Sequence, residues 1–173
     1  MKSLEFPESK QAYYYDCGAN ALQSVLIYYG AVVREEKIVK LAGTKKKGTP
    51  VAGMKAAAKK CDLDYKAGKM TVNEIKKYLD KKIPVILLIQ AWPCKKNTDW
   101  KNDWTDGHYV VAIGYDSTKL YFEDPWTDYR TFLAYEEFIK RWHASIYGKK
   151  HVNWGMAVFG LKISGLSKPK HMD

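Results

Sequence analysis

The sequence predicts an α+β fold in which an N-terminal helical half packs on a C-terminal antiparallel sheet. Apolar residues recur at helical spacing in the first part of the chain, whereas short apolar, β-branched runs dominate from residue 83 onward. A length of 173 residues is that of one domain with a substantial core. The aromatic share of 14% excludes a disordered chain. We expect residues 1–163 to form this single domain and residues 164–173 to be a frayed C-terminal tail.

Four helices are predicted in the first half of the chain, over residues 16–29, 35–41, 51–60 and 71–79. Gly30 and Gly43 follow the first two of these segments, where a C-terminal cap belongs. Thr71 and Glu74 form the T-x-x-E pattern of a capping box at the start of the fourth. These signals define the helical half of the expected fold.

Short apolar runs bounded by turn residues predict strands over residues 83–90, 108–115, 120–123 and 155–163, with one further helix over residues 135–142. The turn residues Asp116, Ser117 and Thr118 separate the second strand from the third, which suits a hairpin. Residues 91–107 form a long polar loop that contains Trp92, Trp100 and Trp104. Two interpretations of this loop stay open: it gates or walls a site, or it only packs its own tryptophans.

Composition restricts the location and the partners of the protein. The longest apolar run, residues 83–91, is far shorter than a membrane span, and residues 1–11 lack the apolar segment of a secretory signal. We therefore expect a soluble, cytoplasmic protein with no membrane partner. Lys and Arg outnumber Asp and Glu by 29 to 19, but the lysines are scattered in pairs and triplets. This pattern favours solvated helix faces over a nucleic-acid surface, with attraction of an acidic partner as the alternative. The sequence does not indicate an oligomeric state.

Three cysteines do not make a disulfide framework, which uses an even and dense set, so a reducing compartment fits best. Cys94 and the histidines lack the spacing of zinc ligands, and we expect no metal and no other cofactor. Cys61 closes the apolar side of the third predicted helix and is expected in the core. His143 is expected at a helix end, where a cation is favourable.

Cys17 carries the strongest chemical signal in the sequence. The first predicted helix begins beside Asp16, so Cys17 lies at its N-terminus, where unpaired N–H groups and the helix dipole favour a thiolate. Gly18 would leave room for the backbone of a substrate. The alternative is a small buried thiol at a helix start, since free cysteine is among the most buried residue types.

Three further residues could complete a site around Cys17. His108 begins a predicted strand and could take the thiol proton. Asp124 ends the next strand, so in a hairpin it would lie beside His108 and could orient it. The side-chain amide of Gln11 and the backbone N–H of Cys17 could together hold an oxyanion. Singly, a strand-end histidine and an aspartate before proline are commonly structural. Together they supply a nucleophile, a base, an orienting carboxylate and an oxyanion donor.

The segments that carry these residues resemble the papain-like cysteine peptidases that process bacteriocin leader peptides. They read Q-A-Y-Y-Y-D-C-G-A-N-A-L from residue 11, D-G-H-Y-V-V-A-I-G-Y-D from residue 106 and L-Y-F-E-D-P-W from residue 120. The resemblance covers residues 11 to about 159. It implies the papain-like fold, with Cys17 as nucleophile, His108 as general base, Asp124 as its orienting group and Gln11 in the oxyanion hole.

In transporters this family forms the N-terminal domain and cuts after a double-glycine motif, while relatives also occur as free-standing proteins. We expect a free-standing member here, because neither a transmembrane region nor an ATPase follows within the 173 residues. Our hypothesis is a cysteine peptidase, a hydrolase with a peptide or protein substrate, and leader-peptide processing is its suggested role. The cationic surface would suit an acidic leader.

Other interpretations of the sequence stay open. The same catalytic residues could pass the acyl group to an amine or a thiol instead of water, which would give an acyltransferase or an amidase. A module that grips peptides without cutting them is a second alternative, although the presence of both Cys17 and His108 speaks against it. A nucleic-acid binder is a third, and it lacks a recognition motif.

Overall fold

The structure is a computed structural model and describes residues 2–93, 95–96 and 98–160; Cys94 and the predicted tail 164–173 lie outside the described residues. The elements, in chain order, are β1 (Lys2–Ser3), α1 (Cys17–Tyr28), α2 (Glu35–Ala42), α3 (Val51–Lys60), β2 (Asp64–Lys69), α4 (Val72–Asp80), β3 (Val85–Gln90), β4 (Gly107–Tyr115), β5 (Lys119–Glu123), β6 (Thr131–Ala134), α5 (Tyr135–Arg141), β7 (His143–Ile146), β8 (Lys149–Val152) and β9 (Trp154–Phe159).

The main sheet confirms the predicted α+β class. Its strands run in the order β2-β9-β3-β4-β5-β6 with antiparallel neighbours, and β1 adds to β4. Every residue of β3 is buried, and so are the seven central residues of β4. Burial on both faces explains why these strands read as continuous apolar runs rather than as alternating ones. The strands β7 and β8 pair with each other in a separate hairpin.

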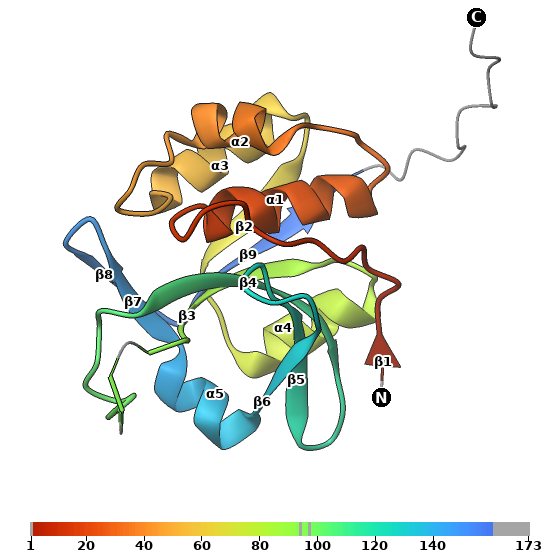
Figure 1. The fold of residues 1–173 in the computed structure, drawn as a ribbon. Helices are drawn as coiled ribbons and strands as arrows, with labels where there is room; N and C mark the ends of the chain where they lie inside the picture. Colours follow the sequence, from red (N-terminus) through yellow and green to blue (C-terminus); the bar gives the residue numbers. More distant parts are fainter. Residues whose placement is uncertain (1, 94, 97, 161–173) are drawn as a thin grey trace, which may run out of the picture.

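Helices cover both faces of the sheet (Figure 1): α1, α2 and α3 lie on one face, and α4 and α5 lie on the other. The helix α1 contacts β4. Its side chains Leu22, Val25 and Leu26 are at most 1% exposed, and each such burial stabilises the fold by roughly 1.5–3 kcal/mol. The N-terminus of α1 is thereby fixed above the start of β4, which is where the site lies.

The predicted helices match the observed ones to within one residue at each end. The capping box is confirmed, since the Glu74 N–H donates to Thr71 Oγ1 at 3.2 Å and the Thr71 N–H donates to Glu74 Oε2 at 2.8 Å. The last strand ends at Phe159, earlier than predicted. The strands β1, β2, β6, β7 and β8 were not predicted, because they are short or polar: β2 reads D-Y-K-A-G-K and β8 reads K-K-H-V.

Among the described residues, none of the helices combines the length and the apolar character that crossing a membrane requires.

Candidate active site

Cys17 is the first residue of α1 and is 8% exposed. It lines a cleft of about 190 Å³ whose walls come from the loop before α1, the turn between α2 and α3, and the strands β4 and β7. The N–H groups of the first turn of a helix have no intrahelical partner, so they face this end of the cleft. The thiol is therefore buried on one side and borders a cavity on the other, as a nucleophile needs.

The predicted hairpin of β4 and β5 is confirmed, and it brings His108 and Asp124 together. His108 is the second residue of β4, and Asp124 follows the last residue of β5. His108 Nε2 and Asp124 Oδ1 lie 2.7 Å apart, and both side chains are buried. His108 also makes a side-chain hydrogen bond with Cys17. With Nε2 used by Asp124, the ring nitrogen that remains for the Cys17 thiol is Nδ1.

The surroundings of His108 and Asp124 favour the charged form of both side chains. Burial would lower the pKa of His108, but the hydrogen bonds with Asp124 and Cys17 outweigh it and raise the pKa to about 10. Burial likewise would raise the pKa of Asp124, but the hydrogen bond with His108 and the positive charge of that ring prevail and lower it. At neutral pH the arrangement therefore favours an imidazolium that is held by a carboxylate.

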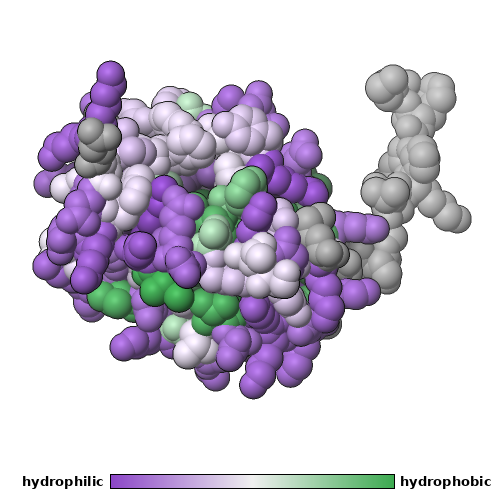
Figure 2. All heavy atoms as spheres, turned by 90° about the horizontal axis from the view of Figure 1, so that it is seen from below, coloured by the Kyte–Doolittle hydropathy of each residue, from purple (hydrophilic) through white to green (hydrophobic). Residues whose placement is uncertain are grey.

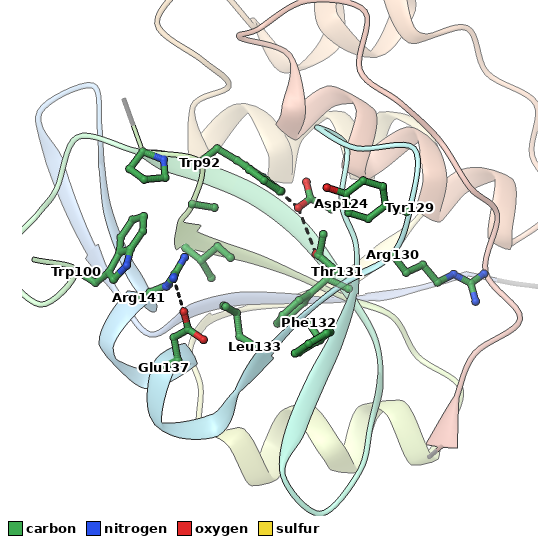
Figure 3. A pocket seen from close by; sticks show the side chains of 14 residues that line it. Trp92, Trp100, Asp124, Tyr129, Arg130, Thr131, Phe132, Leu133, Glu137 and Arg141 are labelled. Carbon is green, nitrogen blue, oxygen red and sulfur yellow. Dashed lines mark hydrogen bonds and ion pairs between the residues drawn. The ribbon is translucent and has the colours of Figure 1, made fainter. Parts of the chain in front are cut away.

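Asp124 accepts three further hydrogen bonds that sequence reasoning missed. The indole Nε1 of Trp92 donates to Oδ2 at 3.1 Å, and Thr131 Oγ1 donates to the same oxygen at 3.3 Å (Figure 3). The Trp126 N–H donates to Oδ1 at 3.0 Å. A carboxylate with this many donors is fixed in orientation, so the His108 ring that it holds is fixed as well. Of these three contacts, only the one between Asp124 and the Trp126 N–H joins residues close enough in the sequence, in D-P-W, to be foreseen from it.

The tryptophans of the 91–107 loop each pack against a different partner. Trp92 binds Asp124, Trp100 lies over the guanidinium of Arg141 at 3.9 Å, and the Trp104 ring lies 4.4 Å from that of His143. The loop therefore packs its tryptophans, as one of the two interpretations expected, but against three different partners outside any common cluster. Since Trp92 holds an oxygen of Asp124, this end of the loop is part of the site.

Gln11 lies in the loop before α1 and is tied to the same region. Its backbone N–H donates to the carbonyl of Pro125 at 2.8 Å, and its Nε2 donates to the carbonyl of Tyr13 at 2.6 Å. The amide has a second N–H on Nε2 that this bond leaves available. Its Oε1 is buried without a hydrogen-bond partner among the described residues. The structure thus places Gln11 beside Pro125, the residue that follows Asp124.

Asp16 organises the loop between Gln11 and Cys17. It is fully buried, and its two carboxylate oxygens accept the Tyr13 N–H at 3.1 and 3.0 Å. Burial raises the pKa of Asp16, and the backbone hydrogen bonds of the loop oppose this rise. The side chain makes no capping hydrogen bond to α1. Asp16 therefore fixes the turn of residues 13–16 that leads into α1.

Gly18 does not leave room for a substrate, which corrects the sequence-based expectation. A Cβ at this position would lie 2.7 Å from the Cβ of Thr49 and 3.0 Å from Cδ2 of Tyr109. The glycine is instead needed because α1 approaches the loop before α3 and the strand β4 closely. This contact holds Cys17 beside β4, and so beside His108.

Glu35, at the start of α2, is a partly buried carboxyl whose pKa depends on the charge of Asp16, the residue before Cys17. Burial and the charge of Asp16 raise the pKa of Glu35 to about 7, although a hydrogen bond with Asn20 opposes the rise. In the unfolded chain a glutamate ionises near pH 4.5. The stability that the protonated carboxyl contributes is therefore complete below pH 4.5 and is lost as the pH rises through 7.

Glu35→Gln, which cannot ionise, is expected to raise the free energy of unfolding at pH 8 and to change it little at pH 4. The expected gain is about 1 kcal/mol, after discounting for the partial exposure of the side chain. Urea unfolding of both proteins at the two pH values measures the difference. An equal effect at pH 4 and pH 8 would contradict the assignment.

Asp124 lines a larger cavity of about 650 Å³, which is separate from the Cys17 cleft in the residues that form its walls. Figure 3 shows its mostly apolar wall, in which Trp92 and Trp100 face Phe132 and Leu133, and the ion pair of Glu137 and Arg141 closes one end. Figure 2, which views the molecule from the side of α4 and α5, shows hydrophobic residues at the surface among hydrophilic ones.

The remaining cysteine and histidine expectations have mixed outcomes. Cys61 caps the C-terminus of α3 and is only partly buried, although it packs against the core. His143 follows the C-cap of α5, as expected, and begins β7; it is buried, with Nε2 at 2.7 Å from the carbonyl of Asp103. In the part of the chain that the structure describes, no three His, Cys, Asp or Glu residues gather as metal ligands would.

Comparisons with known proteins identify the family and the fold of the chain. The family model described as the Peptidase C39 family matches residues 5–148. A search of curated proteins gives no match. The chain is similar to the solved peptidase domain of Streptococcus ComA, a bi-functional ABC transporter involved in a quorum-sensing pathway. That likeness has 24% identity and a TM-score of 0.65, and it covers 92% of this chain and 97% of that one.

Two further solved structures show the same fold. A double-glycine-motif protease from an AMS/PCAT transporter, in complex with the leader peptide, has 20% identity and a TM-score of 0.66, with 90% of this chain and 92% of that chain covered. A C39-like peptidase from Bacillus anthracis has 18% identity and a TM-score of 0.72, with 94% and 99% covered. At these identities the likenesses establish the fold, and they agree with the papain-like architecture that the sequence resemblance implies.

Proposed function

Because the chain belongs to the Peptidase C39 family and is thus indicated to be a cysteine peptidase, we propose that it cuts peptide bonds with Cys17 as nucleophile. One observation carries this proposal. The buried His108 lies 2.7 Å from Asp124 and also bonds to Cys17 at the N-terminus of α1. A base that is oriented by a carboxylate and directed at a nucleophile is the arrangement that acyl transfer requires.

In the proposed reaction, His108 already holds the proton of the Cys17 thiol as an imidazolium, and Sγ attacks the carbonyl carbon of the scissile bond. The resulting oxyanion accepts hydrogen bonds from the Cys17 backbone N–H and from the Gln11 side chain. His108 then gives its proton to the leaving nitrogen, the C–N bond breaks, and a thioester on Cys17 remains. A water molecule that His108 deprotonates attacks this thioester and releases the acid product and the thiolate.

Gln11→Ala is expected to lower kcat by about 100- to 1000-fold and to leave KM within a few-fold, because an oxyanion donor acts mainly in the transition state. Steady-state kinetics on a cleaved peptide separate the two constants. Gln11→Glu, which keeps the size of the side chain but loses its N–H donors, serves as the matched variant and should be equally impaired. A loss confined to KM would argue against an oxyanion role.

The proposal also names leader peptides as a candidate substrate class. Its support is that one structural relative was solved with a leader peptide and another is the peptidase domain of an ABC transporter. The present chain shares their fold over at least 90% of its length.

The proposed activity is tested by incubating the protein with a defined mixture of synthetic peptides, some with a double-glycine motif, and identifying the products by mass spectrometry. Wild type should generate new termini, and Cys17→Ala should generate none. An added amine distinguishes the competing reactions, since an acyltransferase would give amide products in place of the acid. Absence of any Cys17-dependent product would refute the peptidase proposal.

A further inference from the structure

The cleft that Cys17 borders has a strongly cationic mouth. Its floor and walls include Cys17, Thr49 and Tyr109, and its edge is formed by Lys46 and Lys47 of the turn between α2 and α3. Lys45, Lys46 and Lys47 are all exposed. No carboxylate is among the described residues that line this cleft. The position of these lysines beside a candidate nucleophile sets them apart from the other lysine pairs of the chain.

The β7–β8 hairpin extends this positive surface. Tyr147, at the tip of the hairpin, donates its hydroxyl to the carbonyl of Gly48 at 3.2 Å, so the hairpin touches the lysine-bearing turn. Figure 1 shows both at the same edge of the molecule. The strand β8 adds two exposed lysines, Lys149 and Lys150. Lys55 of α3 lies near the hairpin as well. Burial lowers the pKa of His151 in β8, and the charges of Lys149 and Lys55 lower it further, so both lysines lie within electrostatic range of that ring.

We call these six residues the cationic rim: Lys45, Lys46, Lys47, Lys55, Lys149 and Lys150. Among the described residues, none of them forms an ion pair with a carboxylate. Like charges that gather without counter-charges repel one another and destabilise the folded state. Such a surface becomes favourable when an anionic partner covers it.

We infer that the Cys17 cleft takes peptides that carry acidic side chains within a few residues of the scissile bond, where the cationic rim binds them. The inference rests on the proposed function and names the substrate class of that site. An extended peptide rises about 3.3 Å per residue, and Lys46 and Lys47 line the same cleft as Cys17. Their ammonium groups thus reach side chains about two to four positions from the carbonyl that Cys17 attacks.

A peptide fits this surface better than a nucleic acid does. The rim contains lysines only, whereas arginine is the residue that pairs with phosphate in a bidentate manner. The cleft holds about 190 Å³, which suits a peptide backbone with small side chains. The rim also borders the cleft of Cys17, and a thiol with a base such as His108 beside it attacks carbonyl groups, which peptides contain.

The test uses Cys17→Ala protein, so that binding is measured without cleavage, and two labelled 12-residue peptides that differ only in four Glu or four Gln. Fluorescence anisotropy should show that the Glu peptide binds about tenfold or more tightly than the Gln peptide at low salt, with a difference that shrinks as salt rises. Lys46→Gln with Lys47→Gln should weaken binding of the Glu peptide about three- to tenfold.

Lys77→Gln with Lys81→Gln is the matched control. Both lysines are exposed and lie at the end of α4, on the face of the sheet opposite to α2 and α3. Their substitution removes the same amount of positive charge as the double substitution in the rim. This control should leave binding within about twofold. Equal binding of the two peptides, or an equal loss in the control, would overturn the inference. So would tighter binding of a single-stranded oligonucleotide with the same number of charges.

Charge reversal gives an independent result. Lys46→Glu with Lys47→Glu should bind the peptide with four Glu more weakly than Lys46→Gln with Lys47→Gln does, because two negative charges then oppose the four lysines that remain in the rim. Equal binding by these two double variants would count against the rim. If the acidic peptides bind through the rim but wild type cuts none of them, the binding inference stands and the peptidase proposal fails. The two claims therefore have separate readouts.

Discussion

His108→Ala is expected to reduce kcat/KM for peptide cleavage by at least about 1000-fold. His108 is the only described side chain that bonds to both Asp124 and Cys17, so its loss removes the group that holds the thiol proton and the donor to the leaving nitrogen. Kinetics with a peptide that wild type cuts measure the effect. Imidazole added to the assay should restore part of the rate, because it can enter the space that the ring vacates.

Thermal unfolding of His108→Ala serves as the control for that experiment. The variant should remain folded, since His108 is the second residue of β4 and its ring makes its hydrogen bonds at the end of that strand, outside the run of apolar residues that forms the core. A folded variant that retains more than a tenth of the wild-type rate would show that His108 is not the base.

Asp124→Asn is expected to lower kcat/KM by about 100-fold, although asparagine has the same shape and its carbonyl could still accept from His108. We expect this loss because the other carboxylate oxygen of Asp124, Oδ2, also accepts hydrogen bonds. Oδ2 accepts from Trp92 Nε1 at 3.1 Å and from Thr131 Oγ1 at 3.3 Å. In the asparagine variant an NH₂ group would take the position of Oδ2 and face the Trp92 N–H, so two donors would meet with no acceptor between them. These buried groups would stay unsatisfied, and the side chain would rotate away from His108.

Trp92→Phe removes the opposing donor and provides the matched control. Alone it should cost less than about tenfold, and combined with Asp124→Asn it should recover part of the lost activity. A double-mutant cycle on kcat/KM measures this coupling. Strictly additive effects of the two substitutions would show that the contact between Trp92 and Asp124 does not orient His108.

The sequence was sufficient to predict the fold class and the hairpin that brings His108 beside Asp124, because these signals are local. The helical periodicity of α1 and the turn residues between β4 and β5 determine where Cys17, His108 and Asp124 lie along their elements. Once the hairpin is assumed, the ends of its two strands must be neighbours. Gln11 was proposed from its distance of six residues before Cys17 and from the resemblance, and the structure ties its backbone to Pro125, beside Asp124.

The missed features all join segments that are distant in the sequence. No spacing rule relates Trp92 to Asp124, which lie 32 residues apart. The hairpin of β7 and β8 has too few apolar residues to be recognised, so its contact with Gly48 through Tyr147 could not be foreseen. Gly18 was misread for the same reason, since only the packed structure reveals that Thr49 occupies the space above it.

The most direct test of the account is the pH profile of Cys17 alkylation by iodoacetamide, with mass spectrometry to separate Cys17 from the other cysteines. The central claim is that His108 holds its proton beside Cys17, since the hydrogen bonds with Asp124 and Cys17 raise the pKa of His108 to about 10. Wild type should therefore react rapidly at Cys17 already at pH 6, and His108→Ala should react slowly there and speed up only as the pH rises above 8. A wild-type profile that coincides with that of His108→Ala would contradict an activated thiolate and imidazolium pair.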